Sequence, residues 1–233
     1  METSAFLEFI RLVVAGDADG VSRSLSAAPA LATTASPVGA TRQEATDFFF
    51  TGISHYLYAG DTALHMAAAA FSLPIAKLLI SHGADCRAKN RRGAEPLHYA
   101  ADGNRWEPRA QAEVIEYLIS MGAEPNAVDK TGVAPLHRAV RTRSLAAVRA
   151  LLDGRANPRI PNKTGSTPLH LAVQPTGASG SGSVTARQQQ AEIISLLMER
   201  GARPTDKDAR GKQVYQAATS EWIRTLLKSG NTG

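Results

Sequence analysis

The sequence predicts an all-α fold built from stacked repeats, because three kinds of segment recur in a fixed order. A tetrapeptide ending in Leu-His occurs four times, and its copies begin 33, 39 and 33 residues apart. An apolar segment follows each copy, and an Asp/Asn-x-x-Gly segment then leads to the next. Self-similarity near 33 residues indicates a stacked array. The tetrapeptides are TALH (62–65), EPLH (95–98), APLH (134–137) and TPLH (167–170).

The tetrapeptide begins the first helix of each repeat. Pro96, Pro135 and Pro168 stand where a first helical turn needs no backbone donor. Leucine and small alanine residues follow in LHYAA, LHRAV and LHLAV. These residues put compact side chains on the buried side, so neighbouring helices can approach closely.

A second helix and a tight turn complete each repeat. Apolar residues at helical spacing, such as Ile75 and Leu79, predict the second helix. Gly83, Gly122 and Gly201 are expected to end it in the left-handed conformation of a C-terminal cap. The Asp/Asn-x-x-Gly segments predict the tight turn into the next repeat.

The ends of the array depart from this pattern, as does one helix end inside it. Arg155 occupies the position of the helix-ending glycine, so we expect that end to be rearranged around Gly154. The last unit (211–233) has Gln216 instead of the histidine, and we interpret it as a C-terminal cap. The segment 1–32 is interpreted as an N-terminal helix pair with one apolar side facing inward.

These repeats closely resemble the ankyrin repeat, and the resemblance covers about residues 60–225. It implies two antiparallel helices and a protruding β-hairpin loop per repeat, stacked into a curved ankyrin-repeat solenoid. The segment HYLYAGDTALH (55–65) also resembles that of a group of bacterial ankyrin-repeat proteins. Membership of that group implies no particular activity.

The resemblance also implies a structural role for the four repeat histidines, which would bond neighbouring backbone and tie one repeat to the next. Geometry agrees, because stacked helices lie about 8–10 Å apart, whereas zinc ligands must lie about 2 Å from one ion. The row therefore cannot share a metal. These histidines are His65, His98, His137 and His170.

We expect a single ankyrin-repeat domain over residues 1–233. Its expected parts are the N-terminal helix pair (1–32), an aromatic-rich insert (33–59), the full repeats (60–92, 93–131, 132–164 and 165–210), insertions near 102–111 and 174–190, and the cap (211–233).

Composition and motifs argue against several function classes. The single cysteine, Cys86, excludes a disulfide framework and a cysteine-rich zinc site, and it suits a reducing compartment. The N-terminus does not resemble a signal peptide, and no apolar stretch approaches the roughly 20 residues of a membrane span. We therefore expect a cytoplasmic protein. Metalloprotease, nucleotide-binding and hydrolase motifs are absent from the sequence, so we expect neither an enzyme nor a cofactor.

Two insertions interrupt the repeat period at the turn between paired helices. The 39-residue spacing adds six residues around 102–111. Thirteen more lie around 174–190, because 31 residues separate His170 from Gly201 against 18 from His65 to Gly83. Insertions on one face of a solenoid often mark its binding side. Long surface loops are also well tolerated, so both interpretations stay open.

The segment 41–60 is rich in aromatic residues. It holds five of the thirteen aromatic residues, and the alternation of Tyr56 and Tyr58 indicates a strand-like hairpin. The insert either packs onto the solenoid or forms a partner-binding patch. The role of His55 in this segment stays open.

Charge is distributed unevenly along the repeats. The segment 133–163 has seven Lys and Arg against one Asp, a net charge of +6. The preceding segment, 93–132, has three Lys and Arg against seven Asp and Glu, a net charge of −4. These groups either only solvate the surface or form a basic strip for an acidic partner or nucleic acid.

The sequence thus favours a non-catalytic protein-binding scaffold that uses the concave face, the hairpin tips and the inserted loops. We expect the partner to be another protein with an acidic or phosphorylated segment, without involvement of a membrane. The alternative is binding of nucleic acid or another polyanion through the basic repeat at 133–163.

We expect the site itself to be a trough, with Arg141 and Arg143 at its base between the two inserted loops. Planar guanidinium groups suit this role because they can hold two oxygens at once. The candidate partner-binding residues are Arg138, Arg141, Arg143, Arg105, Trp106, Arg109, Arg91, Arg92, Lys130, Lys163, Tyr56 and Tyr58.

Overall fold

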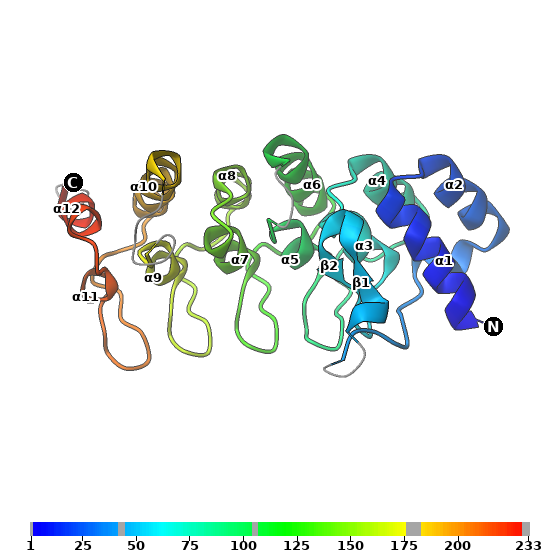
Figure 1. The fold of residues 1–233 in the computed structure, drawn as a ribbon, viewed down its shortest axis with the longest axis horizontal. Coiled ribbons are helices and arrows are strands. Elements are labelled where there is room, and N and C mark those ends of the chain that lie inside the picture. Colours follow the sequence, from blue (N-terminus) through cyan, green and yellow to red (C-terminus); the bar gives the residue numbers. More distant parts are fainter. Residues whose placement is uncertain (1, 42–44, 104–106, 176–182, 230–233) are drawn as a thin grey trace.

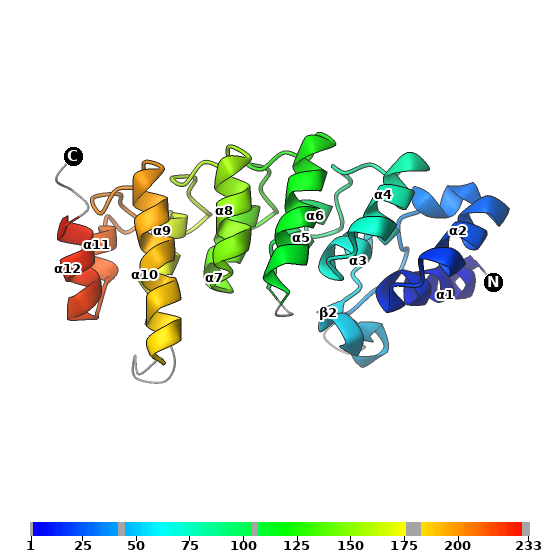
Figure 2. The ribbon, with the colours of Figure 1, turned by 90° about the horizontal axis from the view of Figure 1, so that it is seen from above.

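The computed structural model describes residues 2–41, 45–103, 107–175 and 183–229. Its helices form pairs that stand side by side in sequence order, and loops between the pairs project from one edge of the row (Figure 1). Viewed from above, the row is a shallow arc (Figure 2). The predicted all-α solenoid of stacked helix pairs is confirmed.

Each pair joins a first and a second helix through a short turn or an inserted loop. The pairs are α1 (Glu2–Ala15) with α2 (Ala18–Ala27), α3 (Ala63–Ala69) with α4 (Leu73–Ser81), α5 (Pro96–Ala100) with α6 (Pro108–Ser120), α7 (Pro135–Arg141) with α8 (Leu145–Asp153), α9 (Pro168–Ala172) with α10 (Val184–Glu199), and α11 (Val214–Ala217) with α12 (Glu221–Ser229).

The core runs the length of the row between first and second helices. The tetrapeptide leucines Leu64, Leu97, Leu136 and Leu169 are completely buried. Burying each such side chain stabilises the fold by about 1.5–3 kcal/mol. In the N-terminal pair, the inward side of α1 is also buried, as Phe6 illustrates.

The second helices end as expected at the glycines, but not at Arg155. Gly83, Gly122 and Gly201 have φ angles of 90°, 94° and 102°. Arg155 takes the same left-handed position with φ of 67°, and its amide donates to the carbonyl of Leu152 at 3.1 Å. The expected rearrangement around Gly154 is therefore wrong, because the hydrogen bonds of the cap hold an arginine in a conformation that glycine adopts more easily.

The aromatic-rich insert forms a small hairpin on the inner side of the arc (Figure 2). Strands β1 (Phe49–Phe50) and β2 (His55–Tyr56) are antiparallel, with Phe49 opposite Tyr56. Short 3₁₀ segments, Thr46–Phe48 and Thr51–Ile53, flank β1, and another, Pro29–Ala32, follows α2. Ile53 and Leu57 are completely buried, so the hairpin is packed firmly onto the solenoid.

The two insertions lengthen second helices at their N-terminal ends. Helices α6 and α10 have 13 and 16 residues, whereas α8 between them has 9. Figure 2 shows α6 and α10 extending past α8 on one side of the row. In the part of the chain that the structure describes, no helix is both long and apolar enough to cross a bilayer.

Candidate partner-binding site

The repeat histidines make the same two contacts in every repeat. Nδ1 of each accepts a hydrogen bond, 3.1 Å long, from the amide three residues before it. The proton must then lie on Nε2, which donates to a carbonyl of the following repeat at 3.0–3.3 Å. The carbonyls are those of Ala94, Val133, Ser166 and Lys212.

Burial keeps several of these imidazoles neutral. Desolvation lowers the pKa of His65 and His137, and it lowers the pKa of His98 from 6.5 to about 4. In the cap, the amide oxygen of Gln216 accepts from the amide of Gln213 at 2.9 Å, as the histidine Nδ1 atoms do elsewhere. Both observations support the structural role that the resemblance implies.

A buried carboxylate that sequence reasoning missed anchors the hairpin. Asp61 is completely buried and accepts hydrogen bonds from the Tyr99 hydroxyl at 2.7 Å and from Asn90 Nδ2 at 2.8 Å. It also accepts from the backbone amide of Tyr58 at 2.6 Å. Asp61 thus joins the insert to the second repeat. The only signal for it in the sequence is its place directly before TALH.

His55 lies against this anchor rather than on the open surface. Its ring packs on Tyr99 with centroids 4.4 Å apart, and its Nδ1 lies 2.8 Å from the carbonyl oxygen of Tyr56. Its Nε2 is 4.0 Å from Asp102. Burial lowers the pKa of His55 below its usual value.

A second ionic cluster joins the acidic repeat to the basic one. Asp102 accepts from Arg138 Nη1 at 2.7 Å and from Arg141 Nη2 at 3.0 Å, and Asp129 accepts from Arg138 Nη2 at 3.1 Å. The side chain of Arg138 is only 13% exposed, whereas that of Arg141 is 65% exposed. Burial disfavours the charge on Arg138, but Asp102 and Asp129 outweigh it and raise the pKa of the guanidinium. The prediction that Arg138 is a free partner-binding cation is therefore wrong, because it forms two ion pairs within the chain.

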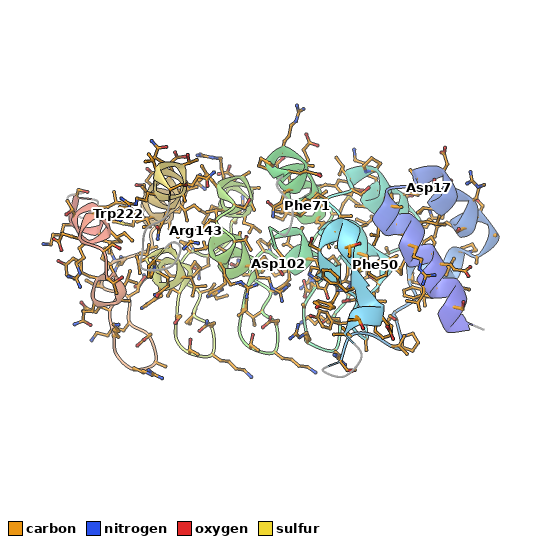
Figure 3. All side chains as sticks on the ribbon, viewed as in Figure 1. Asp17, Phe50, Phe71, Asp102, Arg143 and Trp222 are labelled. Carbon is orange, nitrogen blue, oxygen red and sulfur yellow. The ribbon has the colours of Figure 1, made fainter. Side chains whose placement is uncertain are left out.

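Between the hairpin and this cluster lies a cavity of about 380 Å³, which we call the recess. The hairpin side contributes Tyr56 and Tyr58, and the facing side contributes Thr131 and Arg141. Arg92 also lines the recess, and its guanidinium stacks 4.5 Å from the centroid of the Tyr58 ring. In Figure 3, Asp102 lies on the hairpin side of α7, where it forms part of the wall.

A neighbouring cavity of about 340 Å³ lies beside the same rings. It shares Tyr56, Tyr58 and Arg92 with the recess and adds Arg91, whose guanidinium is 5.7 Å from the Tyr58 centroid. Arg91 also donates to the carbonyl of Ala40. The two tyrosines and Arg92 therefore form a ridge with a hollow on each side.

The structure separates Arg141 from Arg143, which were expected to share one trough. Arg143 has φ of 57° and points toward α9 and α10, where Nη2 donates to the carbonyl of Pro175 at 3.1 Å (Figure 3). Arg141 points the other way, to Asp102 in the recess. The prediction that Arg141 and Arg143 share the base of one trough is therefore wrong. The turn between the two residues sends their side chains to opposite sides of α7.

A groove of about 440 Å³ does lie between the lengthened helices α6 and α10, with α8 as its floor. Its lining is largely apolar, including Pro108, Leu145 and Ala146, with Arg149 at one side. Arg109 is 92% exposed and pairs with Glu113 at 2.9 Å. The candidates Arg105 and Trp106 lie outside the described residues.

The remaining candidates, Lys130 and Lys163, lie at the tips of the projecting loops and are exposed. Other cations of the basic repeat have partners in the chain. Arg159 pairs with Asp206 at 2.7 Å, in addition to the pairs of Arg138 and Arg141. Three of the seven Lys and Arg residues of the segment 133–163 are thus paired with carboxylates, which weakens the case for nucleic acid.

Comparison with known proteins identifies the repeats. The family model described as ankyrin repeats (3 copies) matches residues 40–129 and 107–208, which is most of the chain. No curated protein matches the sequence. Ankyrin repeats are generally protein-binding scaffolds and typically non-catalytic. The matched residues, the stacked helix pairs and the histidine contacts lead to one conclusion: this chain belongs to the ankyrin-repeat family.

Proposed function

We propose that this protein is a non-catalytic scaffold that binds a partner protein on the inner side of its arc, with the recess at the centre of the contact. The observation that carries the proposal is the recess itself, a cavity of about 380 Å³ with tyrosines on one wall and a guanidinium on the other. Tyrosine and arginine are the residue types that most often dominate binding energy at protein interfaces.

The fixed geometry of the recess supports recognition of a side chain or short segment. The buried anchor around Asp61 and the ion pairs of Asp102 hold its two walls. A wall that is already ordered loses little conformational entropy when a partner binds. At about 380 Å³, the recess is near the lower end of the 300–1,000 Å³ found for ligand pockets, so it suits a small portion of a partner.

The experiment is affinity capture from extract of the native host, with and without nuclease treatment, followed by quantitative mass spectrometry. The recess variant carries Tyr56→Ala and Arg141→Ala. The control variant carries Met121→Ala and Arg187→Ala, which remove an exposed apolar side chain and one positive charge away from the recess.

We expect wild type and control to capture the same proteins and the recess variant to lose them. All three proteins should keep similar melting temperatures. Unchanged capture by the recess variant would contradict the proposal. Loss of every captured protein on nuclease treatment would instead favour binding of nucleic acid.

A further inference from the structure

The carboxylates that line the recess are already occupied by groups of the chain itself. Asp102 accepts from two guanidinium groups, through Oδ2 from Arg138 at 2.7 Å and through Oδ1 from Arg141 at 3.0 Å. Asp129 Oδ2 accepts from Arg138 at 3.1 Å, and Asp129 Oδ1 accepts from the amide of Thr131 at 2.8 Å. Neither carboxylate therefore has much capacity left for a cation of a partner.

Two guanidinium groups of the recess, by contrast, keep hydrogen-bond donors for a partner. Among the described contacts, the Arg141 side chain donates through Nη2 alone, and it is 65% exposed. Arg92 is exposed and forms no ion pair within the part of the chain that the structure describes. Its guanidinium lies 4.5 Å from the centroid of the Tyr58 ring. A guanidinium that places its face on a ring keeps the N–H donors at its edge for oxygen atoms.

Contacts within the chain hold both arginines in place. Asn90 Oδ1 accepts from the backbone amide of Arg92 at 2.9 Å, and Asn90 Nδ2 donates to the buried Asp61 at 2.8 Å. Arg141 is held by its ion pair with Asp102, whose side chain is only 10% exposed. Because these contacts exist before a partner binds, less conformational entropy is lost on binding.

These observations favour an acidic occupant of the recess over a basic or an apolar one. A basic side chain would need a carboxylate, and those of the lining already hold guanidinium groups. An apolar side chain would cover the donors of Arg92 and Arg141 without offering an acceptor, which costs free energy. An acidic side chain offers two or more oxygens to the same donors.

We propose that the recess binds an acidic side chain of the partner protein, a carboxylate or a phosphate group, between the guanidinium groups of Arg92 and Arg141. Both arginines line the same cavity of about 380 Å³, and Tyr56 and Tyr58 line it with them. The inference rests on the proposed function, and it adds the chemistry of the group that the recess takes.

The surroundings of the two tyrosines favour a protein over nucleic acid as the source of the anion. Proteins that bind single strands combine cations with aromatic rings on which bases stack. Here Arg92 already lies over the Tyr58 ring, and Tyr56 packs against Phe49 with centroids 4.7 Å apart. Fewer ring faces are therefore open to bases.

The test is an NMR titration of the ¹⁵N-labelled full chain, at constant ionic strength, with acetate for a carboxylate and methyl phosphate for a phosphorylated side chain. Acetamide is the neutral control ligand. The Nε–H signals of Arg92 and Arg141 should shift along a saturable curve with at least one anion, whereas that of the exposed Arg109 should not. The anion that binds more tightly identifies the acidic group. Absence of saturable shifts with both anions, or equal shifts with acetamide, would overturn the inference.

Matched variants connect the binding to the two arginines, with the backbone amide signal of Thr131 in the recess as the reporter. Arg92→Gln with Arg141→Gln should weaken anion binding by about tenfold or more, because charge-assisted contacts are lost. The control pair, Arg109→Gln with Arg187→Gln, removes the same charge from α6 and α10 outside the lining. It should change affinity by no more than about twofold, because salt screens distant charges. Equal losses in the two pairs would contradict the inference.

Affinity capture separates this inference from the proposed function. If the recess variant loses the captured proteins but neither anion binds, the proposed function stands and this inference fails. If an anion binds but the recess variant keeps every captured protein, the recess holds anions, yet the proposed function fails, and with it the acidic side chain of a partner. Loss of every captured protein on nuclease treatment would assign the anion to nucleic acid and overturn the choice of a protein.

Discussion

The inner-helix arginines and the exposed cations at the tips of the projecting loops (the loop-tip cations Lys130, Lys163 and Arg210) carry the same charge but meet different surroundings. Arg138 lies between Asp102 and Asp129, and Arg141 shares Asp102, so both are held by the neighbouring acidic repeat. Lys130 and Lys163 lie on the loops that project from the row. The side chains of Asp129 and Asn162 beside them accept hydrogen bonds from backbone amides. The difference shows that net charge along the chain does not tell which cations are available to a partner.

The comparison assigns separate roles to the two groups. A largely buried ion pair joins one repeat to the next, and losing one partner leaves a charge without its counterion. An exposed, unpaired cation contributes little to folding and keeps its charge for a partner. We therefore expect substitutions of the largely buried Arg138 and its carboxylates to change stability, and substitutions of exposed cations, whether Arg141 or those at the loop tips, to change binding.

The largest effect should follow removal of the carboxylate that holds two arginines. Asp102→Ala leaves Arg138 largely buried with only Asp129, and we expect a loss of about 2–3 kcal/mol in the free energy of unfolding. Arg141→Ala removes only the exposed partner and should lower stability by no more than about 1 kcal/mol. Urea denaturation of both variants tests this order, and equal losses would contradict it.

Acidification should weaken the interior of the solenoid, because it holds a buried histidine. The pKa of His98 is lowered from 6.5 to about 4, so the unfolded chain takes up a proton on this group first as the pH falls. The contribution of neutral, buried His98 to the free energy of unfolding is fully present above about pH 6.5. It is lost as the pH falls from 6.5 to 4, about 3 kcal/mol in all.

His98→Gln isolates this contribution, because glutamine already replaces the histidine at Gln216 in the cap. The variant should show a flatter fall in unfolding free energy between pH 7 and pH 5 than wild type. Urea denaturation at several pH values in this range measures the slopes. Parallel slopes would show that His98 does not titrate as its burial requires.

The smallest effect concerns an exposed arginine outside both groups. Arg155 holds a φ of 67°, where its counterparts Gly83, Gly122 and Gly201 have no side chain. Arg155→Gly should therefore raise the unfolding free energy by about 1 kcal/mol, through relief of left-handed strain. Thermal denaturation tests this, and a loss of stability would mean that the arginine side chain stabilises the helix end.

The sequence predicts the repeats, the helix starts and the helix ends that carry a glycine, because these depend on local chemistry. Proline at the first helical position and glycine at the helix end act within one turn of the chain. The histidine geometry also follows from the repeat, since each ring bonds the amide three residues before it.

The candidate site was only partly predictable, because its contacts join distant residues. Arg138 was correctly noticed as a cation, but its partner Asp102 lies 36 residues away in another repeat. The anchor at Asp61 depends on Tyr99, 38 residues later. The directions of Arg141 and Arg143 differ because a left-handed residue ends the turn, a property that spacing does not reveal.

The central claim is that the loop-tip cations hold a partner and do not hold the fold. Affinity capture and thermal denaturation of the variant with Lys130→Glu, Lys163→Glu and Arg210→Glu, beside wild type, test it most directly. We predict an unchanged melting temperature together with loss of the captured proteins. A folded variant that captures the same proteins as wild type would contradict the claim.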